Sequence, residues 1–266
     1  MGLHFKSIRS SSSGNCLALC TEKSCVLIDC GFNSQISCER TLRTHFGHNP
    51  QIDAVVITHN HGDHISYSSL RTLGQYGIPL RIHENNINTL QEKHFRGYNL
   101  DHVKIQSFSD KSFDICEFEF HPFRVPHQPD YPTYAFLIHY HHGHRWHKLI
   151  IASDFYDGRE IIDHLVDVDF IYIESNHDPQ LLALYPNYNS RFHMSNPKAG
   201  EILCNAREKG KRSPKIVMVG HLSCIRNNTD LALCSICKTF RQNGQKLDFK
   251  IFVAPRYEPS STIRIV

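Results

Sequence analysis

The sequence predicts an α/β protein built as a four-layer αββα sandwich. Short apolar segments of strand length alternate with longer amphipathic segments, and strands followed by helices occur in two rounds along the 266 residues. No linker rich in Pro, Gly or Ser and no low-complexity tract divides the chain. We therefore expect residues 1–266 to form one domain, because a chain of this length can bury one large core.

The first half is predicted to open with three short strands and to continue with alternating helices and strands. The expected strands are 5–9, 16–20, 24–28, 54–57, 80–83, 103–107 and 115–124. The expected helices are 34–46, with Ser34 as its cap, 64–73 and 85–95.

The second half repeats this order. The expected strands are 133–139, 148–152, 170–174, 215–219 and 249–253, and the expected helices are 159–165, 198–209 and 228–243. Five imidazoles lie between the first two strands, in the segment 139–147, and they raise the alternative of a metal site there. A hairpin turning at Gly143, with alternating exposed histidines, explains them more simply.

Composition excludes some classes of protein. No apolar run approaches the roughly 18 residues that a membrane helix needs, and the first residues lack a secretory apolar segment. We expect a cytoplasmic protein without membrane contact, whose ten cysteines are reduced and buried. Cys234 and Cys237 form a C-x-x-C inside a predicted helix, and core thiols are favoured there over a redox or zinc pair.

The net charge of +3 is too small to indicate a partner. The basic residues between 207 and 215 could form a phosphate-binding edge or a solvated helix end: Arg207, Lys209, Lys211, Arg212 and Lys215.

The segment Thr58–His64, which reads T-H-N-H-G-D-H, follows the apolar run 54–57 and carries the strongest chemical signal. Ligand sites of open α/β sheets lie where strands end. His and Asp are ligands for zinc and similar divalent ions. His59 and His61 can turn to one side while Asp63 and His64 reach the other, so the segment can hold two ions.

With other stretches, this motif resembles the metallo-β-lactamase superfamily, and within it the YycJ/WalJ-like branch, whose members look like DNA exonucleases. The stretches are S-S-G-N-C from Ser12, L-I-D-C-G from Leu27, E-S-N-H-D from Glu174, Y-P from Tyr185 followed by Arg191, H-M-S-N from His193 and G-H-L-S from Gly220. They run in family order along essentially the whole chain, so the resemblance implies the metallo-β-lactamase fold.

The resemblance implies a complete set of ligands for two ions, either Zn²⁺ or Mn²⁺. His127 stands between two prolines after a strand, Asp154 ends a strand, and His221 follows another strand through Gly220. His193 is the rival of His221 as the last ligand, and we favour His221. The expected ligands are His59, His61 and His127 for one ion, Asp63, His64 and His221 for the other, and Asp154 between them.

Other residues are assigned supporting roles. Asp29 is expected to orient a ligand histidine, or else to cap the turn at Gly31. Ser12, Ser13 and Asn15 could present a turn to a substrate phosphate, or form only a tight turn, and Arg191 could meet another phosphate. Two positions depart from the family pattern, Gln128 where Asp is usual and Ser11 where Gly is usual. The expected catalytic residues are Asp63, His177 and His193, and a loop-stabilising role for His177 is the alternative.

The resemblance implies a dinuclear phosphodiesterase that cuts DNA from the 5′ end, through a metal-bridging hydroxide that attacks phosphorus. The alternatives are hydrolysis of a small ester, thioester, lactam or cyclic nucleotide, and a metal-binding module without turnover. The complete ligand set counts against that module, whereas fold alone does not decide the substrate.

Overall fold

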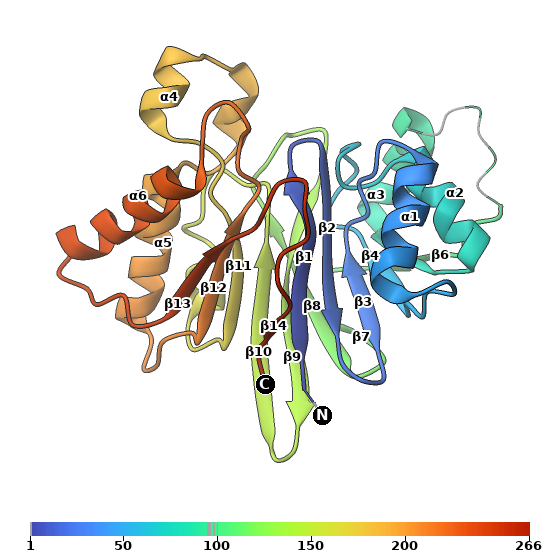
Figure 1. Ribbon diagram of the computed structural model, residues 1–266, viewed down its shortest axis with the longest axis horizontal. Coiled ribbons are helices and arrows are strands. Elements are labelled where there is room, and N and C mark those ends of the chain that lie inside the picture. Colours follow the sequence, from blue (N-terminus) through green and yellow to red (C-terminus); the bar gives the residue numbers. More distant parts are fainter. Residues whose placement is uncertain (1, 95–96, 98, 100) are drawn as a thin grey trace.

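Two seven-stranded mixed sheets pack against each other, and helices cover the outer face of each (Figure 1). The computed structural model describes residues 2–94, 97, 99 and 101–266. Its layers confirm the predicted αββα sandwich. Apolar side chains from the inner faces of both sheets, such as Phe5, Phe120 and Phe136, form the central core, and two further clusters lie beneath the helices.

The first sheet has the strand order β14-β1-β2-β3-β4-β5-β6. Its strands are β1 (His4–Ser11), β2 (Gly14–Cys20), β3 (Cys25–Ile28), β4 (Ala54–Val56), β5 (Leu80–His83), β6 (Ile105–Phe108) and β14 (Ile263–Arg264). The helices on this side are α1 (Gln35–Phe46), α2 (Tyr67–Tyr76) and α3 (Glu84–Thr89), which continues into a π-helical turn, Leu90–His94. The strands from β3 to β6 are parallel.

The second sheet has the order β13-β12-β11-β10-β9-β8-β7. Its strands are β7 (Phe113–Ile115), β8 (Phe118–Val125), β9 (Thr133–His142), β10 (Arg145–Ala152), β11 (Phe170–Glu174), β12 (Ile216–Gly220) and β13 (Lys250–Val253). The helices are α4 (Pro179–Leu184), α5 (Asn196–Lys209) and α6 (Thr229–Gln242), with 3₁₀ turns at Asp163–Leu165 and Tyr188–Phe192. The strands from β10 to β13 are parallel.

Several expected boundaries were wrong. The helix expected at 64–73 begins at Tyr67, because the Ser66 side chain caps it by accepting the backbone N–H of Ser69. The strand expected at 115–124 is two antiparallel strands joined by a turn at Cys116, which has a positive φ of 52°. The helix expected at 159–165 is only a 3₁₀ turn, and α4 was missed. The helix expected at 85–95 ends as the π-helical turn, and its last residue lies outside the described residues.

The cysteine expectation also needs correction. Cys20 and Cys25, a cross-strand pair of β2 and β3, form a disulfide, whereas both were expected as free thiols. Cys116, Cys224, Cys234 and Cys237 are exposed. The C-x-x-C pair therefore lies on the solvent face of α6, while Ile236 and Phe240 supply its buried face.

Candidate metal centre

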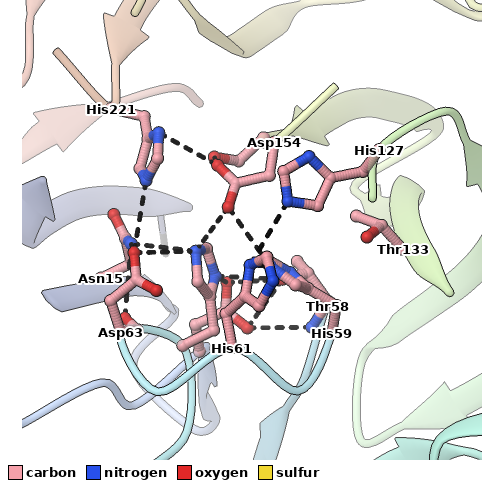
Figure 2. Close-up of polar contacts among 12 residues, drawn as sticks. Asn15, Thr58, His59, His61, Asp63, His127, Thr133, Asp154 and His221 are labelled. Atoms are coloured by element: carbon pink, nitrogen blue, oxygen red, sulfur yellow. Dashed lines mark hydrogen bonds and ion pairs between the residues drawn. The ribbon is translucent and has the colours of Figure 1, made fainter. Parts of the chain in front are cut away.

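The seven expected ligands come together beside the carboxyl ends of strands from both sheets. Figure 2 shows six of them, His59, His61, Asp63, His127, Asp154 and His221. They form two groups that share Asp154. In each group the ligand atoms, one from each residue, lie within 4.8 Å of one another. One group is His59, His61, His127 and Asp154, and the other is Asp63, His64, Asp154 and His221.

The Asp154 carboxylate is the common point of the two groups. Its Oδ2 lies 3.3 Å from His59 Nε2 and 2.8 Å from His64 Nε2, and its Oδ1 lies 3.0 Å from His221 Nδ1. Oδ2 is buried and makes no hydrogen bond of acceptable geometry within the described part of the chain. A buried carboxylate oxygen without a hydrogen-bond partner is costly. Surrounding it with imidazole nitrogens gives a donor set that fits divalent cations.

Strained backbone lies at the same place. Of the non-glycine residues described, only Asp29, Cys116, Asp154, Asp167 and His221 have positive φ. Three of these five are site residues at strand ends, with φ between 55° and 61°. Such conformations cost of order 1–3 kcal/mol each and persist where the surroundings enforce them. The fold thus holds these side chains in positions that a relaxed turn would not provide.

Asp29 aims one of the histidines. Its Oδ2 accepts a hydrogen bond from His64 Nδ1 at 2.7 Å, and its Oδ1 accepts one from the Thr58 backbone N–H at 2.8 Å. These contacts leave His64 Nε2 directed at Asp154. The carboxylate–imidazole arrangement is typical of residues that orient a metal ligand. Asp29 therefore contacts the end of the β4 strand as well as the histidine, rather than merely capping a turn.

The loop of His127 is anchored in a comparable way. His127 Nδ1 donates to the backbone carbonyl of Phe192 at 3.0 Å, which leaves Nε2 3.3 Å from His61 Nδ1. Gln128, which stands where the family usually has Asp, places its Oε1 3.3 Å from His61 Nε2. The amide thus keeps a contact with a histidine of the same group.

Close approach of the backbone requires a glycine at position 31. A Cβ there would lie 1.7 Å from the backbone oxygen of Asp63. Asn15 reinforces the same contact, since its backbone N–H donates to the Asp63 carbonyl at 2.7 Å and its Nδ2 lies 3.0 Å from His64 Nε2. Asn15 is therefore buried beneath the histidine segment and is not free to bind a phosphate, contrary to the sequence expectation.

Glu174 is the last residue of β11 and the first of the E-S-N-H-D stretch. It is a central residue of the site, although sequence analysis assigned it no role of its own. Its Oε1 accepts hydrogen bonds from His193 Nδ1 at 2.7 Å and His221 Nδ1 at 2.9 Å. Its Oε2 accepts from the backbone N–H groups of Phe155 and Met194. The signal in the sequence was its place at the carboxyl end of a buried strand. Asp154 lies at a comparable place, just after β10.

The two groups differ in their electrostatics. Burial lowers the pKa of His59 and His127, and it lowers that of His61 to about 4, so these imidazoles are neutral and available as ligands. Burial also opposes protonation of His64 and His221, but the surrounding carboxylates, Asp154 first, outweigh it and raise both pKa values, that of His221 to about 10. The carboxylates therefore draw positive charge into the second group.

A polar pocket of about 330 Å³ opens beside the two groups. Ser12, Asp63, His193 and His221 line it. Asn176 and Ser223, from the E-S-N-H-D and G-H-L-S stretches, also line it, as does Arg226, which the sequence did not indicate. Ser13 does not line this pocket, because its hydroxyl bonds to Ser11 and to the Arg9 guanidinium.

The other expected substrate contacts lie in a neighbouring groove. His177 and Arg191 line this groove of about 620 Å³ together with His193. Burial lowers the pKa of His177, whose Nδ1 has no hydrogen-bond partner among the described residues.

The basic residues between 207 and 215 lie away from the site. Arg207 and Lys209 lie in the last turn of α5 and the others follow it, whereas this helix of about 20 Å begins beside the site at Asn196. Arg207 pairs with Asp248, Lys209 with Asp163 and Arg212 with the buried Asp169. A phosphate-binding edge at this place is therefore wrong as a part of this site.

The histidines of segment 139–147 lie on the expected hairpin of β9 and β10, which turns at Gly143 with φ of 63°. His141 and His144 are exposed, whereas His147 is buried 3.5 Å from an oxygen of Asp169. His139, His121 and Glu119 have ligand-type atoms within 4.8 Å of one another on partly exposed strands.

No helix of the described chain is long and apolar enough to cross a membrane.

Comparisons with known proteins place the chain in a family. The family model described as a β-lactamase superfamily domain matches residues 25–219. The exodeoxyribonuclease YycJ of Bacillus anthracis is 27% identical over 256 residues, which cover 92% of this chain and 91% of that protein. The exodeoxyribonuclease WalJ of Streptococcus pneumoniae is 26% identical over 270 residues, which cover 95% and 94%.

Among solved structures, the metallo-β-lactamase fold protein YhfI from Bacillus subtilis superimposes with a TM-score of 0.74 at 18% identity, covering 99% of this chain and 100% of that one. The likeness to YhfI concerns the fold, while the family model spans most of the chain and includes all the expected ligands except His221. The chain therefore belongs to the metallo-β-lactamase superfamily, and it is a YycJ/WalJ-like member of it.

Proposed function

We propose that this metal-dependent hydrolase is a DNA phosphodiesterase that removes nucleotides from the 5′ end of a strand. The observation that carries the catalytic part is the pair of ligand groups joined by the buried Asp154 carboxylate. His59, His61 and His127 would hold one divalent ion, Asp63, His64 and His221 the other, and Asp154 both. Zn²⁺ and Mn²⁺ both suit these ligands. When bound, the ions supply Lewis acidity to a phosphoryl group and activate water.

In this proposal Asp63 and His193 act on the reacting groups. Asp63 Oδ2 lies 3.5 Å from both His64 Nε2 and His221 Nε2 and borders the pocket, so Asp63 can orient the attacking water. Glu174 holds His193 Nδ1, which leaves the other ring nitrogen for substrate. Burial opposes protonation of His193, but Glu174 outweighs it and raises the pKa, so His193 can donate a proton to the leaving oxygen.

His177 is the weaker candidate for this proton donor. It lines the groove but not the polar pocket, and its lowered pKa leaves the ring neutral. The backbone of His177 pairs with that of Ser195, next to His193. We therefore assign His177 to the support of the groove and His193 to proton transfer.

The names of the relatives and the charges around the site support DNA as the substrate. YycJ and WalJ are named exodeoxyribonucleases. Arg226 borders the pocket, and Arg191 and Lys198 border the groove, where their charges can meet strand phosphates on both sides of the cut. Ser12 can add a hydroxyl contact to the phosphate in the pocket.

A second candidate is hydrolysis of a small ester, thioester, lactam or cyclic nucleotide. The volume of the pocket, about 330 Å³, favours it, because small-molecule sites begin at about this size. A small substrate would occupy the pocket alone and would not need the adjoining groove.

A nuclease assay separates the two candidates. Purified protein loaded with Mn²⁺ or Zn²⁺ is expected to release mononucleotides from a 5′-phosphorylated DNA strand, and EDTA should abolish the release. Binding of the strand should weaken steeply with salt. Each phosphate that the protein neutralises adds about −0.7 to the slope of the logarithm of the binding constant against the logarithm of the salt concentration. Hydrolysis of a nitrophenyl phosphodiester without cleavage of DNA under any divalent ion would favour the small substrate.

A further inference from the structure

The segment between β11 and α5 exposes aromatic side chains beside the metal centre. Residues 183–189 are all exposed, and Leu184, Tyr185 and Tyr188 are 71%, 53% and 70% exposed. Figure 1 shows α4 standing above the rest of the molecule at the top of the view. Single exposed apolar residues are ordinary, but a group of them next to a site marks an interaction surface.

The exposed segment borders a groove that joins the metal pocket. Asn187, Ser190 and His193 line both the groove and the pocket, so the two spaces are continuous. The groove has a volume of about 620 Å³, and its lining contains more apolar groups, such as Leu182, Pro186 and Tyr188. A substrate whose reacting bond lies at Asp154 would therefore extend past Tyr188.

The groove has the charge of a phosphate-binding surface. Arg191 and Lys198 line it, and no Asp or Glu does. Lys198 Nζ donates to the backbone carbonyl of Tyr156 at 3.4 Å, and among the described residues neither cation forms an ion pair with a carboxylate. The Arg191 guanidinium lies over the Tyr188 ring, with Cζ 3.6 Å from the ring centroid, and 4.4 Å from the Phe192 centroid. One face of Tyr188 is thus covered by a cation, while most of the side chain remains open to solvent.

The exposed segment is held in place despite its exposure. The Arg226 guanidinium donates to the backbone carbonyls of Tyr185 and Pro186, and the Asn187 side chain accepts from the Asn189 backbone N–H at 2.8 Å. Since Arg226 also lines the metal pocket, it ties the aromatic segment directly to the site. A preorganised surface loses less conformational entropy when a ligand binds.

We propose that Tyr188 and Arg191 form a stacking platform for an unpaired nucleobase, which holds a single strand of nucleic acid in the groove with a phosphodiester at the metal centre. This inference rests on the proposed function and specifies its substrate as a single strand. Surfaces that combine aromatic rings with a basic groove bind single strands with little sequence preference, because every base has a face that can stack. Inside a duplex the base faces are covered, so the platform needs an unpaired base or a strand end.

Binding of modified strands tests the platform. The ligands are a 5′-phosphorylated thymidine strand of about 10 nucleotides and an abasic strand of equal length and charge, both with phosphorothioate linkages that resist cleavage. Fluorescence anisotropy with the metal-loaded protein measures Kd. We expect the thymidine strand to bind about tenfold more tightly than the abasic strand. We expect Tyr188→Ala to remove this difference and Tyr188→Phe to retain it.

The control is Trp146→Ala, which removes an aromatic ring of similar exposure at the β9–β10 hairpin and should leave both Kd values unchanged. A preference for bases that persists in Tyr188→Ala would overturn the platform, and so would equal binding of both strands by the wild-type protein. Those results would leave the nuclease activity of the wild-type protein standing, whereas failure to bind or cut any DNA would overturn the proposed function as well.

Discussion

Two parts of this chain are rich in histidine, the segment Thr58–His64 and the hairpin segment 139–147. They differ in whether the fold brings their side chains together with other possible metal ligands. The first lies at the carboxyl end of β4, where side chains from β8, β10 and β12 ends join it around one buried carboxylate. The hairpin histidines spread over an antiparallel pair of strands, where neighbouring side chains point to opposite faces. His139 meets His121 and Glu119 there, but on partly exposed strands. Histidine content alone therefore does not indicate a metal site. Convergence of strand ends from distant parts of the chain does.

The difference between the two histidine-rich segments depends most on Asp154. This carboxylate belongs to both ligand groups, and no residue of the segment 139–147 joins two groups in the described structure. We expect Asp154→Asn to lower the number of bound ions below two and to lower kcat/KM by more than about 100-fold. Loss of groups that only orient ligands already costs 10–100-fold in affinity or activity. Elemental analysis and the nuclease assay measure these effects. Asp157→Asn is the matched control, because that exposed-loop carboxylate pairs with Arg159 instead. Two ions at full occupancy in Asp154→Asn would remove it as the bridge.

Within the site, His193 and His221 are the two histidines whose roles must be separated, because the Glu174 carboxylate contacts both rings. We expect His221→Ala to lose one ion. We expect His193→Ala to retain both ions and to lose turnover by about 100-fold or more, as for a general acid. Metal content and single-turnover rates of each variant separate the roles. The reverse pattern would exchange the assignments of the two histidines.

Glu174→Gln should have an intermediate effect. The amide keeps the size of the side chain but no longer holds a negative charge beside His193, so the pKa of His193 should fall. Since burial otherwise lowers that pKa, the protonated fraction at neutral pH should decrease. The prediction is a roughly tenfold lower kcat at neutral pH that recovers as the pH is lowered. A pH–rate profile checks it, and a loss of rate that does not depend on pH would contradict it.

The smallest effect is expected for the hairpin. The double variant His141→Asn and His144→Asn should keep two ions per chain and turnover within about twofold of wild type, since exposed substitutions away from special contacts change little. Elemental analysis and the nuclease assay check this. A fall of one ion in this variant would show that the hairpin carries a metal site of its own and would break the comparison.

Much of the site was predictable because its signals are local. The expected ligands lie at or within a few residues of strand ends, as His59 does after β4 and His221 after β12. The H-x-H-x-D-H spacing can be read without any tertiary information. The order of strands and helices likewise predicted the αββα layers, because each buried strand is a run of apolar residues.

The misjudged residues were those whose surroundings come from far along the chain. Asn15 appeared suited to a phosphate until folding placed it beneath Asp63 and His64, 48 and 49 residues away. Arg207 and Arg212 looked like a basic edge, but Asp248 and Asp169 neutralise them. Glu174 was recognised only as part of a polar strand end in the family motif, and folding then brought His193 and His221 to its carboxylate.

The sequence by itself thus determined which elements form and which residues have the chemistry of ligands, because hydrophobic periodicity and ligand spacing are properties of neighbouring residues. Only the tertiary structure decided which polar side chains share one space. Burial, hydrogen-bond partners and pKa shifts arise from residues brought together across two sheets, and no local pattern encodes them. The exposed aromatic segment at Tyr188 is of the same kind, since only the fold joins the groove that it lines to the metal pocket.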